Sequence, residues 1–280
     1  MTPPTDYTVG LAPSKFMATG VERATSGPRW SHVRDLLREL IVRDIKLRYR
    51  GSIFGVAWTL LNPIAELLVL MFIFSTVLSF DIKNYSSFLF TGLLVYGWFQ
   101  SSLLFATGAI VNNRELVKRP GVPVIILPIV TVASTLVHFL IALPVLFALL
   151  MLTGTRFTGA LLTLPALIAV QFALILGISY VVATVYVWFR DTQYLLRVAL
   201  QLLFYLTPVF YETRSIPAQY QSWYHLNPMV WMLSAYRAVL MDGALPDPHT
   251  MLSLVLMVAG LLIIGIAVFT RASHLFADEL

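Results

Sequence analysis

Long apolar runs constrain this chain more than any other feature. They occupy residues 54–80, 86–111, 123–152, 161–188, 192–211 and 251–270. About 20 apolar residues in an α-helix are needed to cross the roughly 30 Å hydrocarbon core of a bilayer. Within lipid, a helix also satisfies all of its own backbone hydrogen bonds. We therefore predict an all-α integral membrane protein with six transmembrane helices.

The composition excludes several classes of protein. Hydrophobic residues make up 58% of the chain and charged residues 12%, about half the charged share of a soluble domain. The absence of cysteine excludes disulfide frameworks and thiolate metal sites. The sequence contains no G-x-x-x-x-G-K-[ST] phosphate loop, no H-E-x-x-H and no G-x-S-x-G, and its five histidines are scattered. We predict that the chain is not itself an enzyme and holds no metal or cofactor of its own.

The basic residues are distributed unequally between the two sides of the predicted bundle. Of the 19 Lys and Arg residues, nine lie in 1–53, three in 112–122, two in 189–197 and one in the C-terminal tail, all on one side. Basic residues are retained in the cytoplasm, so both termini are predicted to be cytoplasmic. The excess positive charge follows membrane sidedness and forms no single patch, which argues against nucleic acid as a partner.

The N-terminal region divides into two segments. Residues 1–29 are rich in Pro, Thr, Gly and Ser and predict a flexible cytoplasmic tail. Residues 30–50 carry apolar side chains at helical spacing, with basic and acidic residues between them. A basic amphipathic helix of this kind lies flat in the membrane interface. It is either a plain surface anchor or a platform for a cytoplasmic partner.

Residues 212–240, between the fifth and sixth apolar runs, predict two short helices. The first covers 217–225, and the second covers 228–240 with Asn227 as its N-cap and Pro228 at its first helical position. The second helix is apolar but only about 20 Å long, too short to cross the bilayer. A re-entrant helical hairpin on the outer face accounts for this pattern better than an ordinary external loop.

Few ionisable side chains are expected at membrane depth. Glu66 follows the helix-disrupting Asn62-Pro63 pair and is interpreted either as a carboxylate satisfied by a neighbouring helix or as a pore-lining group. His138 is interpreted as a hydrogen-bonded packing residue. Aromatic residues cluster on the fifth run and beyond it, where they are either interfacial anchors or a lining on which sugar rings could slide.

Three motifs at matching positions resemble one family of transporters. They are residues 43–63 (RDIKLRYRGSIFGVAWTLLNP), residues 189–191 (FRD) and residues 225–228 (HLNP). On these motifs the chain, after its tail, is similar to the Wzm-like permeases, the transmembrane subunits of O-antigen-type polysaccharide ABC exporters. The first motif is quite specific, whereas the other two are weak alone.

The resemblance implies a mechanism and its partners. Two copies of the permease domain (51–280) would form a homodimeric channel in the bacterial inner membrane, joined to two copies of a cytoplasmic ABC ATPase that binds ATP and Mg²⁺. The substrate would be a polysaccharide built on a polyprenyl-diphosphate lipid. The helix at 30–50 would rest on the ATPase, and a coupling helix at 112–120 would receive its motion.

The resemblance also assigns site residues. Those implied in ATPase coupling are Arg38, Arg43, Arg114, Glu115, Leu116 and Lys118. Those implied in lining the channel are Trp58, Asn62, Glu66, Phe204, Tyr205, Phe210 and Tyr211. Those implied in the outer gate are Tyr220, Trp223, Tyr224, Asn227, Pro228 and Trp231. A permease for teichoic acid or another polyprenyl-linked polymer, a secondary transporter and a membrane-embedded transferase are the alternatives.

Overall fold

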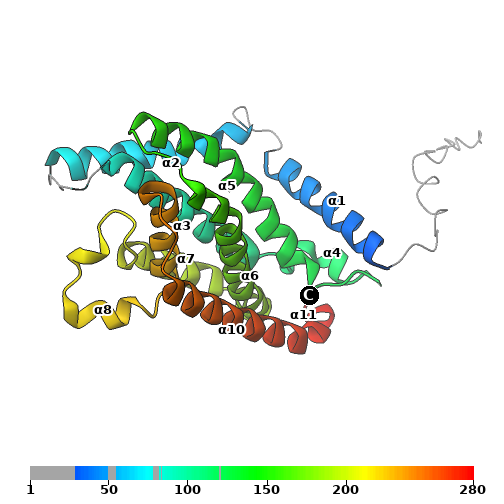
Figure 1. Ribbon diagram of the computed structural model, residues 1–280. Helices are drawn as coiled ribbons and strands as arrows, with labels where there is room; N and C mark the ends of the chain where they lie inside the picture. The colour runs from blue at the N-terminus through cyan, green and yellow to red at the C-terminus, as the bar shows by residue number, and fades with distance from the viewer. Residues whose placement is uncertain (1–28, 50–54, 78–81, 83, 120) are drawn as a thin grey trace, which may run out of the picture.

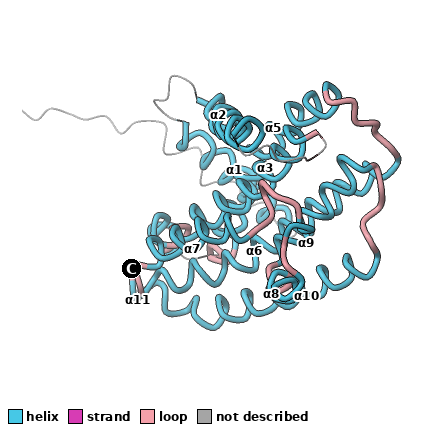
Figure 2. The backbone as a smooth tube through the Cα atoms, turned by 90° about the vertical axis from the view of Figure 1, so that its left-hand side faces the viewer, coloured by secondary structure: helices cyan, strands magenta, loops and turns pink. Residues whose placement is uncertain are grey.

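The computed structural model describes residues 29–49, 55–77, 82, 84–119 and 121–280, which form helices joined by loops and contain no strand (Figures 1 and 2). Most of the predicted tail, residues 1–28, lies outside the described residues, as do 50–54, 78–81, 83 and 120. The α-helices are α1 (Arg29–Tyr49), α2 (Trp58–Met71), α3 (Tyr85–Thr107), α4 (Arg114–Val117), α5 (Ile126–Leu152), α6 (Leu164–Trp188), α7 (Thr192–Leu206), α8 (Ala218–Tyr224), α9 (Pro228–Arg237), α10 (Pro248–Ala272) and α11 (Phe276–Glu279). The 3-10 segments are η1 (Gly55–Ala57), η3 (Val111–Asn113), η4 (Gly159–Thr163), η5 (Thr213–Ser215) and η7 (Ser273–Leu275), and the π-helical segments are η2 (Phe72–Val77) and η6 (Ala238–Asp242).

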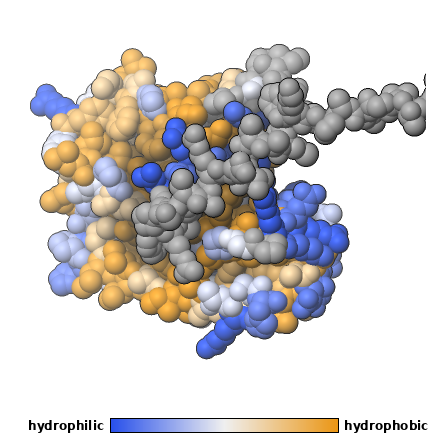
Figure 3. All heavy atoms as spheres, turned by 90° about the vertical axis from the view of Figure 1, so that its right-hand side faces the viewer, coloured by the Kyte–Doolittle hydropathy of each residue, from blue (hydrophilic) through white to orange (hydrophobic). Residues whose placement is uncertain are grey.

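Four of the described helices are long and apolar enough to cross a membrane. They are α3, α5, α6 with the preceding η4, and α10 with the segment that follows it. The apolar window of α3 is 72% buried inside the protein, whereas that of α10 is only 22% buried. Helix α3 is therefore the centre of the bundle, and α10 lies at its periphery with apolar side chains facing outward. On the face shown in Figure 3, apolar residues cover a broad area between hydrophilic patches, as expected of a lipid-exposed surface.

The first and fifth predicted spans are shorter as helices. Helix α2 runs through Pro63 and passes into π-helical η2, and its apolar part is residues 60–74. Helix α7 ends at Leu206, five residues before the predicted end of the fifth span. The reason is Pro208, because the residue before a proline is pushed out of the helical region, and Thr207 is accordingly extended. Residues 207–211 instead form a turn.

Two glycines allow α6 and α10 to pack closely side by side. A Cβ atom built on Gly265 would lie 2.1 Å from the carbonyl oxygen of Gly177, and one built on Gly177 would lie 2.9 Å from the backbone of Leu262. Contact at this distance is possible only without side chains, as in the small-residue interfaces of membrane helices. The pair fixes the position of the peripheral helix on the bundle.

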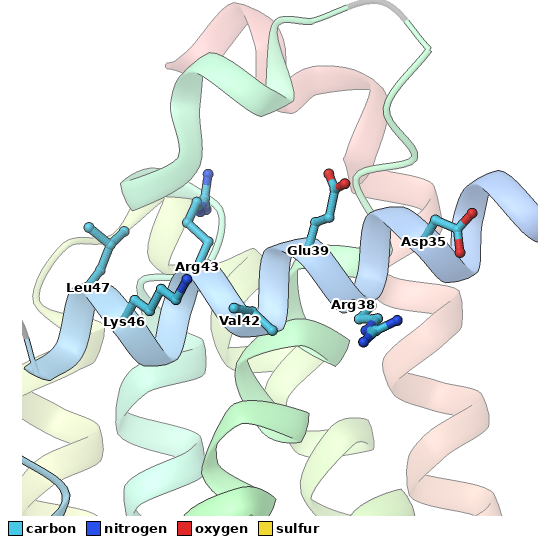
Figure 4. A pocket seen from close by; sticks show the side chains of 7 residues that line it. All are labelled: Asp35, Arg38, Glu39, Val42, Arg43, Lys46 and Leu47. Atoms are coloured by element: carbon cyan, nitrogen blue, oxygen red, sulfur yellow. The ribbon is translucent and has the colours of Figure 1, made fainter. Parts of the chain in front are cut away.

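Helix α1 covers the segment predicted to be an amphipathic helix and begins at Arg29. Its apolar side packs on the start of α5, where Leu40 is buried with Ile126 and Val130. Its charged residues 38, 39, 43 and 46 are exposed. Figure 4 shows α1 running across the other helices rather than along them. We call the part of the molecule that contains α1, α4 and α11 the α1 end.

The two short helices predicted between the last two spans are present as α8 and α9. The side chain of Asn227 accepts a hydrogen bond from the backbone N–H of Met229, and Pro228 occupies the first turn of α9, so the predicted cap is confirmed. Helix α8 is exposed, but α9 is packed into the core, where Met229, Met232 and Tyr236 are fully buried. We call residues 212–240 the hairpin and their part of the molecule the hairpin end.

Candidate functional site

The exposed side of α1 forms a groove at the α1 end. Its volume is about 750 Å³, and it is lined by Asp35, Arg38, Glu39, Val42, Arg43, Lys46 and Leu47. Figure 4 shows Leu47, Arg43 and Glu39 projecting to one side of α1 and Arg38 to the other. Val42 and Leu47 are 43% and 55% exposed, so apolar surface lies among the charges. A surface of this mixed kind can bind another protein, because its apolar part would be buried on contact and its charges would orient the partner.

The segment after α3 lies against the same helix. The Arg43 guanidinium donates a 2.6 Å hydrogen bond to the side-chain oxygen of Asn113, which joins α1 to η3. Asn113 in turn donates to the carbonyl oxygen of Ala109, in the turn that follows α3. Arg43 is thus linked through one side chain to the turn that follows the central helix of the bundle.

The predicted coupling helix is shorter in the structure than in the sequence prediction. Residues 112–120 were expected to form it, but the α-helix covers only the four residues of α4, and residue 120 is outside the described residues. Arg114, Glu115 and Lys118 are exposed, whereas Leu116 is half-buried and packs on both apolar clusters at the α1 end. Leu116 therefore anchors α4 to the bundle, and the three charged side chains face solvent.

Three of the predicted channel-lining residues share a pocket between α2, α3 and α5. This pocket has a volume of about 430 Å³. Trp58, Asn62 and Glu66 line it from α2, together with Gln100 of α3 and His138 of α5. Glu66 is exposed on the protein surface there. The structure thus places the two ionisable residues expected at membrane depth in one largely apolar pocket, which the sequence alone did not predict.

The other four predicted channel-lining residues form a separate aromatic cluster around the end of α7. Phe204 is buried, with its ring centroid 5.3 Å from that of Tyr96, whereas Tyr205 is 55% exposed. Phe210 stacks on Phe74 of η2 with 5.1 Å between ring centroids. The Tyr211 hydroxyl donates a 3.0 Å hydrogen bond to the carbonyl oxygen of Tyr205. In the single chain, Tyr205 is the member of this cluster that offers most surface to a ligand.

The predicted gate residues lie on the hairpin and differ in exposure. Tyr220 and Trp223 of α8 are 52% and 73% exposed. Tyr224 lies 3.3 Å from the Tyr211 hydroxyl, and the Trp231 indole N–H donates a 2.7 Å hydrogen bond to the carbonyl oxygen of His225. Asn227 caps α9 and also donates a 2.9 Å hydrogen bond from its side-chain nitrogen to the Thr207 hydroxyl. Asn227 therefore ties the hairpin to the turn that ends α7.

Arg237, which is not among the predicted site residues, is one of the most connected residues of the hairpin. It is 9% exposed, and its guanidinium donates 2.7 Å hydrogen bonds to the carbonyl oxygens of Pro208 and Val209. A longer bond of 3.4 Å reaches the carbonyl oxygen of Phe88, and the guanidinium carbon lies 3.4 Å from the centre of the Phe88 ring. Its position within the apolar stretch 229–241 was the signal that could have revealed it, because a charge inside an apolar helix requires internal partners.

The opposing surface of α3 is shaped for this contact. A Cβ atom built on Gly92 would lie 2.7 Å from the Val209 carbonyl oxygen and 3.0 Å from the Arg237 guanidinium. The turn can approach α3 this closely only because Gly92 has no side chain. Arg237 and Gly92 together hold the turn at 207–209 against the centre of the bundle.

No group of three or more His, Cys, Asp and Glu residues within the part of the chain that the structure describes could hold a metal ion.

Comparison with known proteins gives a consistent family. The model of the ABC-2 type transporter family matches residues 35–241, from the α1 groove to the end of the hairpin. The chain is 32% identical over 249 residues to the O-antigen export system permease protein RfbA of Myxococcus xanthus, which covers 88% of this chain and 96% of the relative. It is also 32% identical to the protein of the same name from Klebsiella pneumoniae, over 88% of this chain and 95% of the relative. The polysialic acid transport protein KpsM of Escherichia coli is 27% identical over 82% of this chain and 90% of the relative.

Proposed function

This chain belongs to the ABC-2 type transporter family, and from that membership we propose that it is the permease subunit of an ABC exporter that carries a polysaccharide of the O-antigen type across the bacterial inner membrane. The observation that carries the proposal is similarity over nearly the whole of both chains to permeases named for O-antigen export. The permease for teichoic acid or another polyprenyl-linked polymer is the alternative. The polysialic acid relative favours a polysaccharide as the cargo.

We propose that ATP and Mg²⁺ bind to a separate ATPase, two copies of which join two copies of this chain. The groove on α1 and the exposed charges of α4 are the surface offered to that partner. The Arg43–Asn113 hydrogen bond supports a coupling role, because it connects this surface to η3, the segment that follows the central helix. Motion of the ATPase would displace α1 and α4 and thereby shift α3.

The transmembrane path is proposed to lie between the two protomers. We propose six spans, because α2 with η2 forms one further span and α7 another beside the four long helices. With six spans, both termini lie in the cytoplasm. The exposed apolar side chains of α2, η2 and α7, which include Leu68, Phe72, Leu195 and Val198, would be covered by the second copy or by lipid. The hairpin is proposed to enter the inner membrane from its outer face as a re-entrant gate. The polyprenyl-diphosphate-linked end of the cargo would enter from the cytoplasmic leaflet of the same membrane.

Affinity purification of the tagged chain in mild detergent tests the proposal. We expect an ATPase with a phosphate-binding loop to copurify in stoichiometric amounts. Deletion of the gene for this chain should cause lipid-linked polysaccharide to accumulate inside the cell and surface polysaccharide to be lost. A chain that purifies alone and whose deletion leaves surface polysaccharide unchanged would contradict it. In that case a secondary transporter would be the next hypothesis, with Glu66 as the first residue to test.

A further inference from the structure

A polar pocket of about 650 Å³ opens at the hairpin end, apart from the groove on α1 and the pocket beside α2. Four segments that are distant in the sequence line it: the loop before α3 with the first turn of α3, the loop between α5 and α6, Glu212 with η5, and the end of α9 with η6. Its lining residues are Ile82, Asn84, Phe88, Thr153, Gly154, Thr155, Arg156, Thr158, Glu212, Thr213, Arg214, Ser234, Arg237, Ala238, Met241 and Asp242. The volume falls within the range of about 300–1,000 Å³ that is usual for small-molecule sites.

The basic residues of this end converge on the pocket. The chain has only four Lys or Arg residues on the side assigned to the hairpin, and three of them, Arg156, Arg214 and Arg237, line this one cavity. Two carboxylates, Glu212 and Asp242, are also present, which leaves the lining with a net positive charge. Solubility of this loop surface, which is otherwise poor in basic residues, does not require its basic residues to lie in one place.

The charge on Arg237 is not neutralised by direct ion pairing. Its hydrogen bonds go to uncharged backbone carbonyls, and its Nε atom is buried without a hydrogen-bond partner. Among the described residues no carboxylate oxygen lies within 4.0 Å of its guanidinium. Glu212 of the same lining attracts the Arg237 charge electrostatically without forming an ion pair with it, so part of the positive potential remains and favours an anion in the adjoining cavity.

We propose that this pocket binds an acidic sugar unit, a carboxylated or phosphorylated residue of the emerging polysaccharide. Arg156 and Arg214 are exposed and can close on the anionic group as bidentate donors, while Arg237 supplies the fixed positive charge behind them. The hydroxyls of Thr155, Thr213 and Ser234 offer partners to sugar hydroxyls. This inference rests on the proposed function, since it names a substrate feature that the exporter would hold on its outer side.

A phospholipid head group could supply the same anionic chemistry. The polar lining favours the sugar, because a bound lipid would also have to place its acyl chains beside charged and hydroxyl side chains. The experiment therefore includes an arm for the lipid.

The test uses the permease in complex with its ATPase, held in nanodiscs of phosphatidylcholine. Binding of fluorescent tetragalacturonic acid, which has four carboxylates, is compared with binding of neutral maltotetraose. We expect the acidic tetramer to bind at least tenfold more tightly. Each of Arg156→Gln and Arg214→Gln should weaken it about tenfold, the effect of losing one charge-assisted contact. Arg271→Gln, a matched loss of one exposed guanidinium at the other end of α10, should leave binding unchanged.

Three results would overturn the inference. They are equal affinity for the two tetramers, unchanged affinity in both pocket variants, and binding of phosphatidylglycerol that displaces the tetramer and depends on Arg156 and Arg214. The last result would assign the pocket to lipid. Copurification of the ATPase is measured in the same preparations, so failure of the sugar site is distinguishable from failure of the exporter assignment.

Discussion

Replacing Arg237 with methionine tests whether one buried guanidinium holds the hairpin against the bundle. Methionine fills a similar volume but donates no hydrogen bond, so the Pro208 and Val209 carbonyl oxygens lose the partners that they have at 2.7 Å. Each buried acceptor left without a partner costs about 1–3 kcal/mol. Removal of a buried charge offsets part of this loss. We therefore expect the contact to weaken by about 2–4 kcal/mol.

Hydrogen–deuterium exchange measures this effect locally. A loss of about 2–4 kcal/mol corresponds to roughly 30- to 700-fold faster exchange of the amides in 207–216, if they exchange through opening of this contact. Amides in the middle of α6 and α10 serve as the internal control, because neither helix contributes a group to the Arg237 contact. Arg237→Lys should give an intermediate result, since an ammonium group keeps the charge but cannot donate the same fork of bonds.

Gly92→Ala approaches the same contact from the other side. Its methyl group would lie 2.7 Å from the Val209 carbonyl oxygen and should push the turn off α3. Because both substitutions break one contact, the double variant should open the turn by less than the sum of the two single effects. If Arg237→Met changes exchange in 207–216 by less than about threefold, the guanidinium contributes little and the reasoning is refuted.

Three other perturbations follow from the structure. Glu115→Arg reverses an exposed charge on α4, so ATP hydrolysis by the complex should continue while export falls. Glu279→Arg, a charge reversal at the same end of the molecule, should change neither ATP hydrolysis nor export. Normal export by the Glu115→Arg variant would contradict the coupling role. Gly265→Ala places a methyl group 2.1 Å from the Gly177 carbonyl oxygen and should lower the free energy of unfolding by about 1–3 kcal/mol. A melting temperature equal to that of the wild type would show that α10 can shift freely and would contradict this prediction. Asp247 accepts hydrogen bonds from Thr250, which lower the pKa of its carboxyl group. The charged carboxylate therefore stabilises the folded chain at pH values above the ordinary pKa of aspartate. The wild type should melt at a higher temperature than Asp247→Asn at neutral pH, and this difference should disappear as the pH falls through the lowered pKa. A difference in melting temperature that does not change with pH would contradict this reasoning.

Elements with a strong local signal were predictable from sequence. The amphipathic pattern of α1, the long apolar helices and the Asn227-Pro228 start of α9 each depend on residues within one or two helical turns. The end of α7 was misplaced, although its cause is also local. Pro208 lies inside an apolar run, and hydropathy alone does not register that a proline excludes the preceding residue from the helix.

The sites depended on which helices face one another. Glu66 and His138 are 72 positions apart in the sequence, and only the packing of α2 and α5 against α3 brings them to one pocket. The predicted channel-lining set was divided for the same reason, because η2 and the turn after α7 pack Phe210 against Phe74 and away from that pocket. Their place in the dimer stays a prediction.

The sequence by itself determined that the chain resides in a membrane and that it carries no G-x-x-x-x-G-K-[ST] phosphate loop, and it predicted which side its basic segments favour. These properties follow from composition and local order, since hydropathy and charge act on a segment whatever its neighbours are. Only the tertiary structure decided that Arg237 is a buried clamp and that Gly177 meets Gly265. Those contacts join residues far apart in the chain, and whether a charge is satisfied or a glycine is required depends on the backbone that packs against it.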